Sequence, residues 1–143
     1  MVKPFKICMI FIFIFSNVNG YLQGIKVEGR ILCQNVPISD LEILLKDQDY
    51  FFDDTLQKGK TNKDGYFALS GKDYEFTKIT PYIQLTWTCP KHYIKSHHDT
   101  MKFYVLENAT IYYHEYLRYY FNFGDIDLYN VVNDLYQLPE KYV

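Results

Sequence analysis

The sequence has no excess of positive charge. Its 143 residues include 15 basic and 17 acidic side chains, which give a formal net charge of −2. A chain with this balance has no electrostatic footprint for nucleic acid or anionic lipid by charge alone. Internal repeats, low-complexity stretches and linkers are also lacking, and the length suits one domain. We therefore expect a single folded unit that does not bind nucleic acid.

Long hydrophobic runs are scarce as well, and the longest lies near the start of the chain. Residues 7–15 are all apolar and follow Lys3 and Lys6, while Val18 and Gly20 fit the −3 and −1 positions of a signal-peptidase site. This pattern is typical of a secretory signal peptide. The alternative is a membrane anchor, but the run spans only about half of a bilayer core.

The predicted signal peptide covers residues 1–20 and leaves a mature domain at residues 21–143. Loss of Lys3 and Lys6 leaves 13 basic against 17 acidic residues, a net charge of −4. We expect this mature chain to be secreted and extracellular, and not to span a membrane.

Cysteine is rare. Three are present, and Cys8 lies in the predicted leader, so that Cys33 and Cys89 remain. Each of these two ends an alternating apolar pattern, at residues 25–33 and 83–89, in which side chains two apart share one face of a strand. An even cysteine count in an exported chain favours a disulfide. We expect a bridge between them, and two buried free thiols are the alternative.

Aromatic residues, by contrast, are abundant, with 15 Tyr and 11 Phe. These residue types favour half-buried pleated surfaces. Short alternating segments separated by turn signals predict an all-β sandwich. The expected strands are residues 22–33, 40–46, 55–61, 66–69, 82–89, 101–106 and 121–128.

The connections carry their own signals. Residues 62–65 predict a hairpin loop in which Gly65 takes a positive φ. The polar stretch at 70–78 is expected to connect two strands and has room for one helical turn. Gly124 is expected to kink the last strand, and the apolar spacing of the tail at 129–143 permits a short helix.

Four ordered blocks carry a resemblance to a known family. They are residues 27–33 (VEGRILC), 59–71 (GKTNKDGYFALSG), 79–89 (ITPYIQLTWTC) and 123–128 (FGDIDL). The chain from about residue 24 to 128 therefore resembles the nematode transthyretin-like family. The resemblance implies a transthyretin-like (immunoglobulin-like) β-sandwich of about seven or eight strands in two sheets.

The resemblance also implies an extracellular protein, and most members of the family lack an assigned activity. One member bridges exposed phosphatidylserine on dying cells and a phagocytic receptor, a role that transfers to no particular residue here. This chain lacks the second cysteine pair of many members, and residues 111–122 depart from the family pattern.

We expect a binding or adaptor protein that recognises an extracellular protein or lipid surface. We expect no catalytic activity and no cofactor. The alternative is a carrier of a small apolar ligand or lipid, for example phosphatidylserine, through a pocket or an oligomer interface; such a carrier would be a homo-oligomer.

Enzymatic and metal-binding alternatives find little support. The hydrolase branch of the wider fold uses His and Arg side chains and a Tyr-Arg-Gly-Ser C-terminus, whereas this chain ends EKYV and its only arginines are Arg30 and Arg118. Histidines within 92–98 could gather zinc or copper, and carboxylates within 47–54 could hold calcium. We interpret both stretches as solvated polar loops and expect no metal site.

Two modification or binding sites are predicted. Asn108 begins an Asn-Ala-Thr sequon, which predicts N-glycosylation of an exported chain. Tyr112, Tyr113 and Tyr116 lie in the most tyrosine-rich segment, and Tyr is a residue type that dominates binding interfaces. We expect these three to contribute to a binding surface for a receptor, a lipid or a second copy. The alternative is that the rings face the core and the strand edges.

Overall fold

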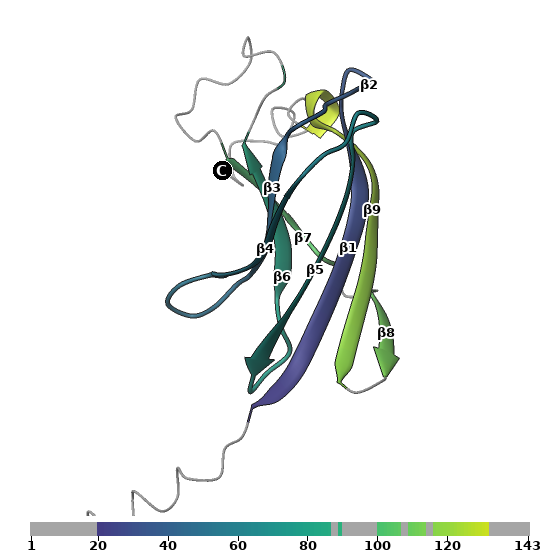
Figure 1. The fold of residues 1–143 in the computed structure, drawn as a ribbon. Coiled ribbons are helices and arrows are strands. Elements are labelled where there is room, and N and C mark those ends of the chain that lie inside the picture. Colours follow the sequence, from purple (N-terminus) through teal and green to yellow (C-terminus); the bar gives the residue numbers. More distant parts are fainter. Residues whose placement is uncertain (1–19, 87–88, 90–99, 107–108, 114–115, 132–143) are drawn as a thin grey trace, which may run out of the picture.

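A computed structural model describes residues 20–86, 89, 100–106, 109–113 and 116–131 of the chain (Figure 1). They form two β-sheets, one of five strands and one of four, that enclose a single hydrophobic core. The predicted all-β sandwich is therefore confirmed. Within these residues, no helix is both long and apolar enough to cross a bilayer.

The strands follow one another in chain order as β1 (Tyr21–Cys33), β2 (Val36–Pro37), β3 (Glu42–Asp47), β4 (Asp54–Lys60), β5 (Tyr66–Glu75), β6 (Pro81–Thr86), β7 (Thr100–Tyr104), β8 (Thr110–Tyr113) and β9 (Leu117–Asp127).

The long strand β1 organises the five-stranded sheet. It pairs with β5 in antiparallel fashion along one edge and with β9 in parallel fashion along the other. The short β2 pairs with the end of β1 along the same edge as β5, and β8 pairs with the outer edge of β9. The second sheet has the order β4-β3-β6-β7 (Figure 1).

The core lies between the sheets and is built by alternating residues. Val27 and Ile31 of β1, Ile43 and Leu45 of β3, and Ile83 of β6 are all fully buried. Side chains two apart share a strand face, so the apolar residue at every second position reaches the same core. These residues are the ones that the alternation predicted to face inward.

A bulge at Gly124 lets β9 keep its apolar residues inward along its whole length. The β1–β9 register shifts between Glu28 and Arg30, and Gly124 has φ +66°. Because one extra residue reverses the alternation, Phe123 and Ile126 both pack toward the core although their positions differ in parity. The predicted kink is confirmed.

Two stretches of strand escaped the sequence analysis. Strand β5 continues to Glu75, because residues 70–75 pair with the first half of β1. The expected polar connection at 70–78, with its helical turn, is therefore wrong over most of its length. Strand β8 and the first residues of β9 pair with each other in a segment for which no strand was expected.

The described residues include only part of the two ends of the chain. A single helical turn covers residues 128–131. The remainder of the tail, for which a short helix was expected, lies outside the described residues, and so do residues 1–19 of the predicted leader.

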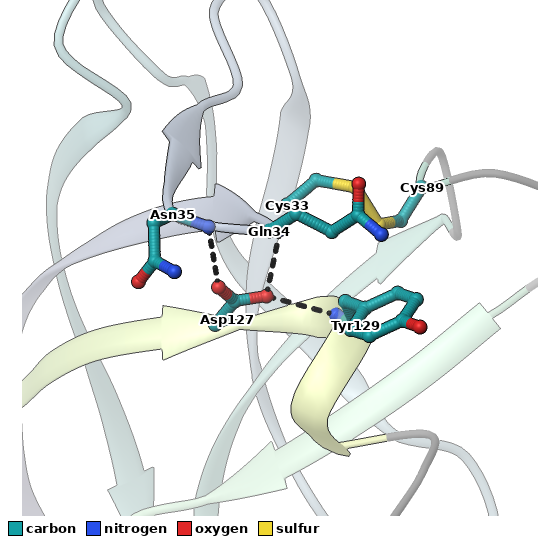
Figure 2. The surroundings of a disulfide bond; sticks show 6 residues. All are labelled: Cys33, Gln34, Asn35, Cys89, Asp127 and Tyr129. Atoms are coloured by element: carbon teal, nitrogen blue, oxygen red, sulfur yellow. Dashed lines mark hydrogen bonds between the residues drawn. A yellow bond between two sulfur atoms is a disulfide. The ribbon is translucent and has the colours of Figure 1, made fainter.

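The predicted disulfide joins the two sheets. Cys33 ends β1, Cys89 follows β6, and their Cα atoms are 5.6 Å apart. Figure 2 shows this bridge beside the turn that follows β1. Since β1 and β6 belong to different sheets, the covalent link holds the sandwich together at this end.

The turn beside the disulfide is held by one carboxylate. Asp127 accepts hydrogen bonds from the backbone N–H groups of Gln34 at 3.1 Å, Asn35 at 2.7 Å and Tyr129 at 3.0 Å (Figure 2). Gln34 and Asn35 have φ of +51° and +63°, a left-handed conformation. Asp127 thereby ties this turn to the end of β9.

Candidate ligand-binding groove

The outer face of the five-stranded sheet presents a row of polar and aromatic side chains. Tyr112 of β8 pairs with Arg118 of β9, Arg118 pairs with Gly24 of β1, and Gly24 pairs with Lys72 of β5. Residues directly opposite one another on paired strands lie on the same side of a sheet. These four positions therefore form one line across four strands that come from distant parts of the sequence.

A groove of about 440 Å³ lies over this line. Its walls include Lys26, Lys72 and Arg118 as cations and Tyr116 as an aromatic ring, and Gly24 contributes bare backbone. The groove therefore combines positive charge from strands β1, β5 and β9 with an aromatic surface from Tyr116, which directly precedes β9.

Gly24 makes room for the aromatic wall. A Cβ at this position would lie 2.6 Å from Cε2 of Tyr116, which is closer than real contacts allow. The ring can lie against β1 only because residue 24 has no side chain. The Arg118 guanidinium lies 4.4 Å from the centroid of the same ring, a cation–π contact that orients both groups.

The positive charge of the groove is only partly compensated. Lys26 is 3.8 Å from the carboxylate of Glu28. Within the described part of the chain, Lys72 and Arg118 form no ion pair with a carboxylate. An anionic group in the groove would thus meet two cations that are not already paired there.

Glu28 follows Lys26 by two residues on β1 and is its ion-pair partner. The hydroxyls of Tyr120 and Tyr66 both donate to its carboxylate, the latter at 2.9 Å. These two hydrogen bonds, with help from Lys26, hold the pKa of Glu28 below its ordinary value. The carboxylate is therefore ionised at neutral pH and offsets the charge of Lys26.

The three tyrosines predicted to bind a partner occupy different positions relative to the groove. Tyr116 lines the groove, and Tyr112 lies beside Arg118 with 54% of its surface exposed. Tyr113 pairs with Leu117 in the backbone register, and its side chain is outside the described part. Tyr119 of the same segment is buried in the core, so the core-facing alternative holds for that ring. Participation of the three tyrosines in binding stays a prediction.

Sequence reasoning did not find Lys26 or Lys72. Lys26 alternates with the buried Ile25 and Val27, a pattern that marks a side chain as outward-facing, whereas the neighbours of Lys72 are only partly buried. Outward-facing lysines are also common on any sheet. Only the register between β1, β5 and β9 shows that these lysines and Arg118 share one groove.

A second group of charges lies at the end of β3. Carboxylate oxygens of Asp47, Asp49 and Glu75 lie within 4.8 Å of one another. Asp47 is 1% exposed and accepts a hydrogen bond from the Thr80 N–H at 2.6 Å. Burial raises the pKa of Asp47 to about 6. The interpretation of 47–54 as solvated loop charge is therefore wrong for Asp47, which ends a strand and is enclosed.

Several predicted features lie outside the described residues. They are the sequon asparagine Asn108 and the histidines at positions 92, 97, 98 and 114. Glycosylation and the interpretation of the histidine stretch therefore stay predictions.

Comparisons with known proteins support the resemblance. A family model for the transthyretin-like family (TTR-52) matches residues 28–105. Transthyretin-like protein 2 of Caenorhabditis elegans is 32% identical over 77 residues, which cover 49% of this chain and 52% of that protein. Transthyretin-like protein 46 of the same organism is 36% identical over 69 residues, 47% of this chain and 38% of its own.

A third relative extends further. Transthyretin-like protein 1 of C. elegans is 32% identical over 97 residues, 59% of this chain and 62% of that protein. The chain thus spans about half the length of the curated relatives it matches. A 9R-lipoxygenase structure from Cyanothece PCC8801 aligns with a TM-score of 0.43 and 16% identity over 89% of this chain and 21% of its own, a likeness too loose to carry an argument. The family match covers more than half of the sequence, and the chain belongs to the transthyretin-like family.

Proposed function

We propose that this protein is a secreted, non-catalytic binding protein that acts as an adaptor in the extracellular space. Three observations support the proposal. The first 20 residues have the pattern of a signal peptide. The Cys33–Cys89 disulfide suits an oxidising compartment. The family to which the chain belongs is of a binding type.

The groove over Gly24 is the single observation that carries the binding role. It places Lys72 and Arg118 on either side of Gly24 in one line across the sheet and adds the ring of Tyr116 as an apolar wall. Two cations held by rigid strands favour an anionic group, and an aromatic ring favours a flat or apolar part of the same ligand. The partner that fits is an acidic segment of an extracellular protein or an acidic lipid head group.

A titration with O-phosphoserine tests the groove. We expect the backbone amide signals of Gly24, Gly71 and Arg118 in the isotope-labelled mature protein to shift together, with saturation. The Lys72→Glu variant should lose this response. The matched control is Lys63→Glu, which makes the same charge change in the exposed turn before β5 and should keep the response. Absence of any groove shift at high phosphoserine would refute the proposal.

Recognition of an anionic lipid is the second candidate, favoured by the same cations beside an aromatic wall. Binding of the mature protein to two kinds of vesicle, phosphatidylcholine alone and phosphatidylcholine mixed with phosphatidylserine, distinguishes lipid recognition from protein recognition. Binding only to the mixed vesicles, weakened by salt and lost in Lys72→Glu, would support the lipid role. A carrier that uses an oligomer channel further requires a homo-oligomer, so a monomeric mass in sedimentation equilibrium would argue against it.

A further inference from the structure

The loop between β3 and β4 presents three consecutive aromatic rings to solvent. Tyr50, Phe51 and Phe52 are 100%, 87% and 86% exposed. The loop projects from the side of the four-stranded sheet, away from the strands of the other sheet (Figure 1). We refer to residues 50–52 as the aromatic tip. Exposed apolar clusters of this kind mark sites of interaction, because leaving them in water is unfavourable.

The base of the loop is held firmly although its tip is exposed. The carboxylate of Asp53 accepts hydrogen bonds from the Tyr82 hydroxyl at 2.5 Å, from Lys102 Nζ at 3.0 Å and from the Asp49 N–H at 3.3 Å. Tyr82 is fully buried, although it alternates with the core residues Ile83 and Leu85 of β6 and so lies on the opposite face of the second sheet. A tip on a fixed base loses little further freedom when a partner binds, and this pre-organisation favours association.

The aromatic tip is large enough to provide much of one side of a protein interface. An aromatic side chain buries about 150 to 250 Å² when it is fully covered. Three such side chains would provide at least about half of the roughly 800 Å² that each partner contributes to a standard protein interface. Tyr and other aromatic residues are also the types that carry most of the affinity in such interfaces.

The surroundings of the tip are acidic. Asp49 and Glu75 lie in the carboxylate cluster at the loop base, and Asp54 begins the next strand. Burial and the repulsion of neighbouring carboxylates, Asp54 and Asp73 among them, raise the pKa of Asp49, and burial with repulsion from Asp49 and Asp73 raises that of Glu75. The loop base therefore has a negative potential, which repels anionic membranes and attracts lysine and arginine side chains.

We propose that the aromatic tip is a second docking surface, which inserts into an apolar pocket of a partner protein whose rim carries lysine and arginine. The rings fill the pocket, and the acidic loop base meets the basic rim. This surface arises from the four-stranded sheet, whereas the groove lies on the outer face of the five-stranded sheet. A protein with two separate docking surfaces can join two partners.

Selection from a random-peptide display library on the mature protein tests this inference. We expect enriched peptides that combine apolar residues with lysine or arginine. The affinity of a synthetic copy, measured by fluorescence anisotropy, should fall about tenfold or more in the Phe51→Ser/Phe52→Ser variant. It should also weaken as salt concentration rises.

Matched controls keep the test specific. Val36→Ser removes an exposed apolar side chain on β2 and should leave the peptide affinity unchanged. Because the tip is exposed, the double serine variant should keep the far-ultraviolet spectrum and melting temperature of the parent. Lys72→Glu should also leave the peptide affinity unchanged, so that failure of the groove and failure of the tip can be distinguished.

Three results would overturn the inference. One is a selection whose peptides bind parent and serine variant equally, or lack basic residues. Another is tip-dependent binding to phosphatidylcholine vesicles, which would make the tip a membrane-inserting loop. The last is tip-dependent self-association in sedimentation velocity, which would make the partner a second copy of this chain.

Discussion

The hydroxyl of Tyr82 donates a hydrogen bond to Oδ2 of Asp53 at 2.5 Å and thereby ties β6 to the end of the β3–β4 loop. Lys102 completes the arrangement, with its ammonium 3.0 Å from the same oxygen and 4.5 Å from the centroid of the Tyr82 ring. Hydrogen bonds from Tyr82 and then Lys102 lower the pKa of Asp53 to about 2. The anchor of the loop is therefore ionised and intact throughout the neutral range.

Removal of the Tyr82 hydroxyl should loosen this anchor. In Tyr82→Phe we expect the pKa of Asp53 to rise toward its ordinary value, because its largest stabilising hydrogen bond is lost. Amide hydrogen exchange in residues 48–53 should become faster while the core strands keep their protection. Carboxyl NMR titration and exchange measurements check both effects. Tyr104→Phe makes the same chemical change on the neighbouring ring, and an equal effect there would contradict the assignment.

The buried carboxyl of Asp47 should make the protein more stable in mild acid. Its pKa is about 6 in the folded state against 3.8 ordinarily. The folded state therefore binds the proton more tightly than the unfolded chain, so the free energy of unfolding falls as pH rises between about 4 and 6. The shift of roughly two pKa units corresponds to about 3 kcal/mol at neutral pH.

Asp47→Asn tests this pH dependence. The amide oxygen can still accept the hydrogen bond from Thr80, but it cannot ionise. We expect the variant to gain about 2 to 3 kcal/mol near pH 7 and to match the parent near pH 4. Urea unfolding across this range measures the difference. Asp40→Asn changes an exposed carboxyl and is the control. If the free energy of unfolding of the parent and of Asp47→Asn changed with pH in parallel, the assignment of the pH dependence to Asp47 would be wrong.

Asp127 should stabilise the left-handed turn after β1. In Asp127→Ala, the N–H groups of Gln34, Asn35 and Tyr129 lose their shared acceptor. We expect a loss of about 1 to 2 kcal/mol, since the groups are partly solvated and water replaces some of the bonds. Asp127→Asn keeps one acceptor oxygen and should lose less. An alanine variant as stable as the parent in urea would show that the turn does not depend on this carboxylate.

Export and modification can be tested in secretion-competent cells. The full chain, expressed with its own leader, should appear in the medium with Tyr21 as its first residue. Glycosidase treatment should reduce its mass, and Asn108→Gln should abolish that reduction. Retention in the cells with the leader attached would contradict the proposed compartment. A secreted protein whose mass does not change with glycosidase would refute only the glycosylation.

Local chemistry made much of this fold predictable from the sequence. The alternation of Ile43 with Leu45 places both on one strand face, and Gly65 has its predicted positive φ of +74° in the turn between β4 and β5. These two strands belong to different sheets, so the expected hairpin is instead a connection between the sheets. Cys33 and Cys89 end core-facing patterns in a chain whose first residues have the pattern of a signal peptide, which is why their bridge could be predicted. These features depend on residues close together in the chain, or on one-dimensional periodicity.

The candidate sites depend on contacts that no local pattern contains. Arg118 and Lys72 share a groove because both pair with Gly24, and neither pairing follows from composition or spacing. Burial of Asp47 and the anchoring of Asp53 by Tyr82 likewise arise when β3 and β6 pair. The sequence by itself determined the strand class, the core faces and the disulfide, whereas only the tertiary structure decided which outward side chains meet. The reason is that strand register joins residues far apart along the chain.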